Sequence, residues 1–373
     1  MVGFSMLMFL RELTGTFELA GSAVGVGFIA MAIGAPIQGR LIDRYGPRFV
    51  LRVTGVMQPL ALAAILASAK LDLPFTVTIL CSALSGFFAS PITTLTRALW
   101  RHRFETDEER RIAFALDAVT IELNFTLGPA LVAGILAMFG ATYAFALSIV
   151  VVFAAFLTFI SSRAIGYFKS DPTSERHLLG PLTEPRLWIL FIATLGLTVC
   201  FGMLEVGYPA YATFMAAPAL GGVLLGINSL GSAMGGMLYG GLHFKARIER
   251  QFAGALGLMA IPLIAHVFFL QPIAVGVIAF FVGALIAPSI AAQNVLVSRL
   301  APAKYATEAF TWSSTFIVSG LGVGMALGGV LVENAGLRTN FGVGAAIVAA
   351  MALLALAMGA SSSRTPRASP EAP

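Results

Sequence analysis

The sequence has little charge: only 11% of its 373 residues are Asp, Glu, Lys or Arg. A soluble domain carries about 25% charged residues, because its surface must meet water. Hydrophobic residues make up 58%, in blocks long enough for helices to cross a hydrocarbon core roughly 30 Å thick. The short alternating segments of a membrane β-barrel are absent. The composition therefore predicts an all-α integral membrane protein.

Other absences narrow the function. The two cysteines, Cys81 and Cys200, lie inside apolar blocks, so neither a disulfide framework nor a metal site is predicted. No His/Asp/Glu metal spacing and no G-x-x-x-x-G-K-[ST] loop is present, which argues against a metalloenzyme and against ATP coupling within the chain. We expect no cofactor and no enzymatic activity.

The apolar blocks predict eleven membrane spans, after a partial helix at residues 1–10. The predicted spans are 17–38, 48–69, 73–97, 112–138, 141–162, 186–213, 218–243, 252–270, 272–298, 307–332 and 339–360. The longest polar interruption, 164–185, is predicted to be a cytoplasmic linker. It separates an N-terminal helical bundle, 1–163, from a C-terminal one, 186–360, and residues 361–373 are expected to form a disordered cytoplasmic tail.

Basic residues concentrate in alternate loops, and this orients the chain. Of the 23 lysines and arginines, all but Arg11, Lys70 and Arg338 lie at every second break between predicted spans or in the tail. Cytoplasmic loops carry an excess of basic residues. We therefore expect a multi-pass protein of the cell (inner) membrane with a cytoplasmic C-terminus. The net charge of +5 is an orientation signal, and no nucleic-acid partner is predicted.

The two bundles resemble each other in sequence. Residues 39–41 (GRL) align with 240–242 (GGL) at an offset of 201, and 127–132 (LGPALV) with 327–332 (LGGVLV) at 200. Gly86 and Pro91 reappear with the same spacing as Gly283 and Pro288. A helical unit used twice, with the substrate path between the copies, is the organisation of many transporters.

The most specific motif is GRLIDRYGPR at residues 39–48. It resembles the loop between helices 2 and 3 of the major facilitator superfamily, roughly G-x-L-x-D-R-x-G-x-R. The residues that match are Gly39, Leu41, Asp43, Arg44, Gly46 and Arg48. This resemblance implies a fold of two six-helix bundles and a bacterial, efflux-type transporter, and the short apolar piece at residues 1–10 implies that the first helix is truncated here.

The physics of the loop supports a gate. We expect Gly39 to permit close helix approach, Gly46 to permit a tight turn, and Pro47 to begin the next helix. The resemblance implies that Asp43 holds the two bundles together on the cytoplasmic side. The second copy has Phe244 and Arg247 at the positions of Asp43 and Gly46, so it lacks the carboxylate that the resemblance assigns to the gate. The alternative is that the motif is only a basic cytoplasmic turn.

Charged and polar residues inside the spans are candidates for proton coupling or for lining a cavity. They are Arg97, Asp117, Glu122, Asn124 and Glu205. Buried charge in a membrane usually faces a bundle interior or water. Glu122 would lie about 16 Å beyond Arg111 along a helix, near the bilayer midplane. Arg97 and Asp117 alternatively form a structural ion pair.

Two further features concern helix ends and kinks. Gly128 and Pro129 are similar to the glycine-proline motif of helix 5 in proton-coupled exporters of the family, which implies a helix-5 kink. Glu205 is expected near the outer end of its span, where with Tyr208 it lines an outward cavity. Equally, it is an interfacial carboxylate that meets water. The other polar residues in spans, including Gln38, Gln58, His266 and Gln293, are expected to form interhelical hydrogen bonds.

The functional hypothesis is a transporter that exports a small amphiphilic or sugar-like molecule by alternating access and proton antiport. Its expected partners are the substrate, the lipid bilayer and protons, and the expected state is a monomer. The alternatives are a non-transporting membrane receptor or remnant, and a membrane-embedded enzyme.

The repeat also bears on the start of the chain. Aligning Ala20-Gly21 with Leu220-Gly221 at an offset of 200 matches Met1 to Phe201, inside the first span of the second bundle. Roughly 15 residues of the equivalent helix are then missing. Either the start codon lies upstream or the protein works with a short first helix. We expect the former, because an unfilled helix position would destabilise a packed bundle.

Overall fold

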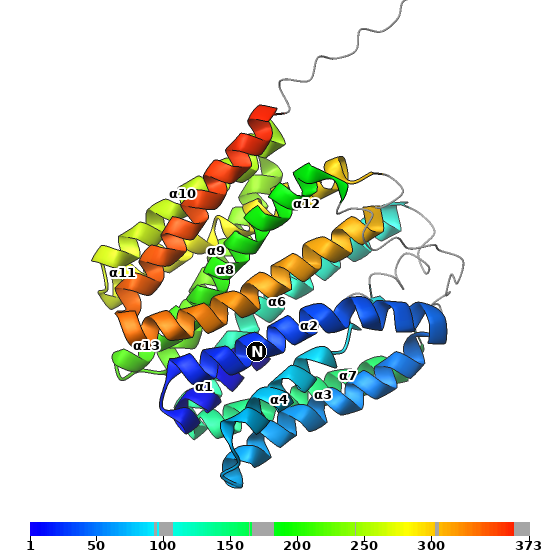
Figure 1. Ribbon diagram of the computed structural model, residues 1–373, viewed down its shortest axis with the longest axis vertical. Helices are drawn as coiled ribbons and strands as arrows, with labels where there is room; N and C mark the ends of the chain where they lie inside the picture. The colour runs from blue at the N-terminus through cyan, green and yellow to red at the C-terminus, as the bar shows by residue number, and fades with distance from the viewer. Residues whose placement is uncertain are drawn as a thin grey trace, which may run out of the picture.

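The computed structural model describes residues 1–92, 95–96, 107–163, 165, 183–242, 244–302 and 306–361, apart from some side chains, chiefly in α6. The described chain is helical, and Figure 1 shows its arrangement. The helices are α1 (Val2–Thr14), α2 (Phe17–Tyr45), α3 (Pro47–Lys70), α4 (Phe75–Phe87), α6 (Asp107–Phe139), α7 (Ala141–Ser161), α8 (Pro185–Phe214), α9 (Ala219–Gly241), α10 (Ile248–Phe268), α11 (Pro272–Gly283), α12 (Ile286–Leu300) and α13 (Ala306–Ser361).

Eight helical segments of the described chain are long and apolar enough to cross a membrane. One of them lies in α13, which reverses at Gly336, whose backbone is not helical, so it contains the two spans predicted at 307–332 and 339–360. Shorter apolar helices cover 75–87 and 126–139. The prediction of an all-α membrane protein with repeated spans is confirmed. The predicted linker and tail lie almost wholly outside the described residues.

Two predicted spans are broken, at equivalent places in the repeat. The span predicted at 73–97 ends as helix α4 at Phe87, and the span at 272–298 is split between α11 and α12. Pro91 has no N–H to donate to the carbonyl of Phe87. The side-chain amide of Gln38 in α2 donates to that oxygen instead, at 2.6 Å. Pro91 thus interrupts the helix, and the Phe87 carbonyl that it leaves without a helical partner is bonded by Gln38 of the neighbouring α2 instead.

The repeat also appears in the contacts between helices. A Cβ on Gly86 would collide with the carbonyl oxygen of Gly27, and one on Gly283 with that of Asn228. Gly27 of α2 and Asn228 of α9, the partners in these two contacts, are 201 positions apart in the sequence. The register predicted from Ala20-Gly21 is therefore wrong by one residue, because backbone contacts rather than residue identity fix the match.

The turns follow the same symmetry, with one exception. Gly15 and Ala216, which follow α1 and α8, both have left-handed backbone, with φ of 79° and 55°. Gly46 has φ 81° as its turn requires, and Pro47 begins α3, as predicted. Arg247 instead has φ −61°. The second copy of the motif therefore makes a different turn.

The two halves, α1 to α7 and α8 to α13, lie side by side, with the first part of α13 along α2 (Figure 1). We call the end of the bundle with the turns at Gly15, Gly140, Ala216 and Gly336 the Gly15 end, and the opposite end the Gly46 end. Polar residues inside the spans bond between helices as predicted. His266 lies 3.2 Å from the Tyr208 hydroxyl, and Gln293 donates to Ser313.

The strained turn after α8 gives a stability prediction. Left-handed backbone costs an L-residue roughly 1–2 kcal/mol, whereas glycine adopts it freely but loses more entropy on folding. We expect Ala216→Gly to stabilise the protein by about 0.5–1 kcal/mol, measured as a higher midpoint of thermal unfolding in detergent. The neighbouring Ala217→Gly, without that strain, serves as control. An equal or larger gain from the control would contradict the assignment.

Candidate functional site

The first contact between the halves is the crossing of α2 and α13. A Cβ on Gly21 would lie 2.5 Å from the carbonyl oxygen of Met325, and a Cβ on Gly25 2.5 Å from that of Gly322. Gly329 in turn has the carbonyl of Phe17 against it. Small residues let membrane helices approach until their backbones touch. This crossing is therefore a backbone contact along more than two turns of each helix.

The second contact is the crossing of α6 and α9, the repeat-related counterpart of the first. A Cβ on Gly222 would lie 2.5 Å from the Cβ of Ala133 and 2.7 Å from the carbonyl oxygen of Pro129. Gly128 and Pro129 are both buried, and α6 runs as one helix through them. The residues expected to kink helix 5 thus lie at the interface between halves; the kink itself stays a prediction.

A polar latch joins the halves at the Gly15 end. The carboxylate of Glu333 in α13 accepts a hydrogen bond from the backbone N–H of Phe17, at 3.0 Å. Phe17 is the first residue of α2, where backbone donors lack helical partners and a negative charge is favoured. The side chain of Asn334 donates to Glu18 at 3.1 Å. This latch could not be predicted from the sequence, because its partners are 316 residues apart.

The glycine contacts of this crossing lie toward the Gly15 end. The Cβ position on Gly322 has Gly25, Phe28 and Ile29 of α2 as its nearest neighbours. Gly34 lies against Phe87 of its own half, and a Cβ on Gly39 would meet nothing within 4 Å. The close approach predicted at Gly39 is therefore not seen among the described residues. The glycine contacts between the halves that the structure describes lie toward the Gly15 end.

The motif at the Gly46 end presents its basic side chains to the surface, while Ile42 between them is buried. Leu41, Arg44 and Arg48 are exposed, and the Arg44 guanidinium lies 5.2 Å from the centre of the Tyr45 ring. The side chain of Asp43 lies outside the described residues. Its gating role stays a prediction.

The intramembrane candidates are only partly visible. Arg97 lies outside the described residues, as do the side chains of Asp117 and Glu122, although both belong to α6. Asn124, on the same helix, is exposed. These positions do not test the predicted ion pair or the predicted proton site.

Glu205 is half-buried in the middle of α8. Its carboxylate is close enough to the Met1 amino group for their charges to interact, and Met1 in turn lies against Gly128 of α6. The structure thus brings together two candidates, Glu205 and Gly128, from different halves. Tyr208 does not line an outward cavity in this conformation, because its side chain is fully buried against His266 and Phe341, and the place of Glu205 in such a cavity stays a prediction.

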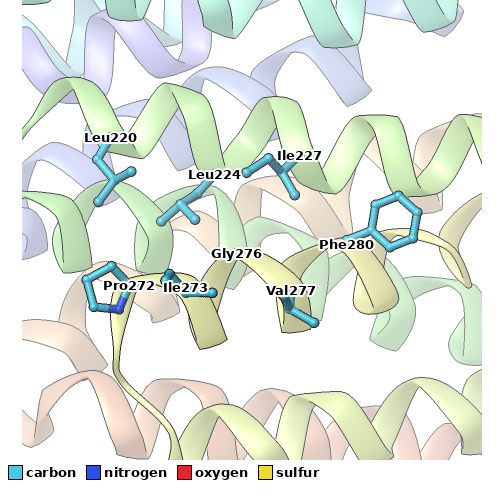
Figure 2. A pocket seen from close by; sticks show the side chains of 8 residues that line it. All are labelled: Leu220, Leu224, Ile227, Pro272, Ile273, Gly276, Val277 and Phe280. Atoms are coloured by element: carbon cyan, nitrogen blue, oxygen red, sulfur yellow. The ribbon is translucent and has the colours of Figure 1, made fainter.

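A groove of about 380 Å³ lies between α9 and α11. Figure 2 shows the side chains that face one another across it, among them Leu220, Leu224, Ile273 and Phe280. All of its lining residues are apolar, and Ile273 is 83% exposed. With no hydrogen-bonding side chain, the groove is not a site for a proton or for a polar substrate.

Comparison with known proteins agrees with this architecture. Relatives include the multidrug resistance protein MdtG of Rahnella sp., 22% identical over 341 residues that cover 88% of this chain and 81% of that protein. The protein of that name from Proteus mirabilis is 23% identical, covering 88% of this chain and 82% of its own. A crystal structure of a point mutant of the nucleoside transporter NupG matches with a TM-score of 0.73 and 12% identity, covering 96% of this chain and 97% of that one.

The family assignment rests on a match over most of the chain. The sequence model of the Major Facilitator Superfamily matches residues 1–320, which include the α6–α9 crossing and the motif at 39–48. The chain belongs to the Major Facilitator Superfamily of membrane transporters.

Proposed function

We propose that the protein is a proton-coupled exporter of small molecules that works by alternating access across a bacterial cell membrane. The observation that carries this proposal is a pair of repeat-related crossings between the halves, whose backbone contacts in the described residues lie toward the Gly15 end. Such an arrangement lets the halves rock about a site between them. The names of the relatives favour export of varied compounds, whereas the likeness to NupG concerns the fold alone.

The two ends take complementary roles in this proposal. With the Gly15 end closed by the crossings and the latch, the Gly46 end is the open one. The excess of basic residues favours a cytoplasmic Gly46 end and a cytoplasmic C-terminus. When the Gly15 end opens, Asp43 of the motif would hold the Gly46 end closed. The protein is proposed to have no enzymatic activity.

Proton coupling needs a carboxylate that changes its access as the halves move. Glu205 fits, because it sits mid-helix in α8 beside residues of the other half. Glu122 is the second candidate, from its expected depth in the membrane. Arg97, Asp117 and Asn124 would then adjust the charge around the path.

The α2–α13 crossing gives a conformational prediction. Gly25→Ala places a methyl group against the Gly322 carbonyl and the Ala326 side chain, so the closed state should lose about 1–3 kcal/mol. A cysteine replacing Met325, which is 1% exposed, should then react faster with a maleimide, in a background without Cys81 and Cys200.

The matched control is Gly254→Ala in α10, where a Cβ meets nothing within 4 Å. Its labelling rate at position 325 should stay at the level of the parent protein. Equal acceleration by both substitutions would show that the crossing does not hold the closed state.

The latch gives a second prediction. Glu333→Ala removes the acceptor of the Phe17 N–H, which should cost about 1–2 kcal/mol, and Glu333→Gln should cost less because it keeps a neutral acceptor. The first turn of α2 should therefore exchange its amide hydrogens faster, as measured by mass spectrometry. Arg338→Ala, at an exposed position just beyond the Gly336 turn, should leave this exchange unchanged. No change with Glu333→Ala would rule the latch out.

The coupling residues give a third prediction. Glu205→Gln or Glu122→Gln should abolish accumulation against a gradient while sparing substrate exchange, because a neutral amide cannot carry the proton. Glu184→Gln is the control, since Glu184 precedes α8 and makes no capping hydrogen bond. If both variants still concentrate substrate, neither carboxylate carries the proton.

The function itself is tested in proteoliposomes with a panel of compounds, nucleosides included. Substrate-dependent proton movement supports the exporter proposal. A non-transporting receptor or remnant would bind compounds without moving protons, and a membrane-embedded enzyme would convert them. Nucleoside uptake without export of other compounds would overturn the proposed substrate class and direction.

A further inference from the structure

A second cavity, of about 420 Å³, lies at the Gly15 end between the two halves. The first half contributes Glu12 from α1 and Leu136 and Ala137 from the end of α6. The second half contributes Ala217, Pro218 and Ala219 from the turn between α8 and α9. The cavity therefore lies at the Gly15 end of the α6–α9 crossing. The equivalent place at the α2–α13 crossing is occupied by the latch.

The repeat explains why the α6–α9 crossing leaves room for this cavity. Pro218 stands at the position of Phe17 at the offset of 201, and Ala133 at the position of Glu333 at the offset of 200. Phe17 is 1% exposed and fills its crossing, whereas Pro218 is small and exposed. Proline has no N–H and alanine no carboxylate, so this latch hydrogen bond cannot form at the second crossing.

Glu12 gives the cavity its charge. It is the one charged residue among the lining residues, all others being Leu, Ala, Gly or Pro. Within the described part of the chain, its carboxylate has no hydrogen bond or ion pair. The neighbouring guanidinium of Arg11 lies 5.6 Å from the centre of the Phe17 ring, against the first residue of α2. A single carboxylate beside apolar walls suits a cation with an apolar body.

We propose that this cavity binds amphiphilic organic cations, with the positive centre beside Glu12 and the apolar groups against walls from both halves. A bound ligand bridges the halves at the second crossing, which has neither a large side chain like Phe17 nor the latch hydrogen bond. It therefore favours the state in which the Gly15 end is closed. The proposal does not rest on the exporter function, since binding is measured on purified protein without transport.

The probe is tetraphenylphosphonium, and the reporter is a cysteine replacing the exposed Ala137, in a background without Cys81 and Cys200. We expect the probe to slow labelling of this cysteine by a maleimide. Tetraphenylborate, with the same four phenyl groups and the opposite charge, should protect it less. Glu12→Gln should raise the phosphonium concentration needed for half-protection about fivefold, as expected for a partly exposed ion pair.

Two controls locate the site. A cysteine replacing Asp72, in the turn after α3 at the same end, should not be protected. Pro218→Phe introduces the side chain that Phe17 has at the equivalent position of the first crossing. It should fill the cavity and abolish protection of the residue-137 cysteine by the probe. Equal protection by phosphonium and borate, unchanged half-protection in Glu12→Gln, or protection of the residue-72 cysteine would overturn the proposal.

Discussion

Backbone contact at two helix crossings is the constraint on which the arrangement of this protein depends. In a membrane, apolar side chains gain little by leaving lipid for one another, so helix association relies on close packing and on hydrogen bonds. Gly21, Gly25 and Gly222 supply that packing between the halves. Because these contacts lie toward the Gly15 end, they leave the Gly46 end as the place where the halves can separate.

The repeat divides residues into those that build the scaffold and those that differ between the copies. Gly86 and Gly283 make the same backbone contact in each half, and the paired turns at Gly15 and Ala216 share one backbone conformation. The positions that differ between the copies are those that make the two crossings behave differently. Phe17 with its Glu333 partner closes one crossing, whereas Pro218 leaves a cavity at the other. A pseudo-symmetric molecule thereby gains two unequal contacts, one locked by polar groups and one open to a ligand.

The sequence predicted the fold in much detail, because long apolar blocks, loop charge and the motif at 39–48 are local signals. The positions of most spans, the turn at Gly46 and the internal repeat could all be predicted. The break after Phe87 was missed, since it depends on Gln38 capturing a carbonyl freed by Pro91. The latch of Glu333 and the burial of Tyr208 were also missed, because both are contacts between distant helices that one sequence does not reveal. Glu205 was predicted as a site, but its position beside Gly128 needed the structure.

The central claim is that the Gly15 end closes and opens as the halves rock. Spin labels at Asp72 and Gln271, exposed residues of opposite halves in turns at this end, report the separation by double electron–electron resonance. Without substrate, the account predicts mainly a short distance, with a longer population appearing when a transported compound and a proton gradient are supplied. A single short distance that persists while substrate is being transported would contradict it.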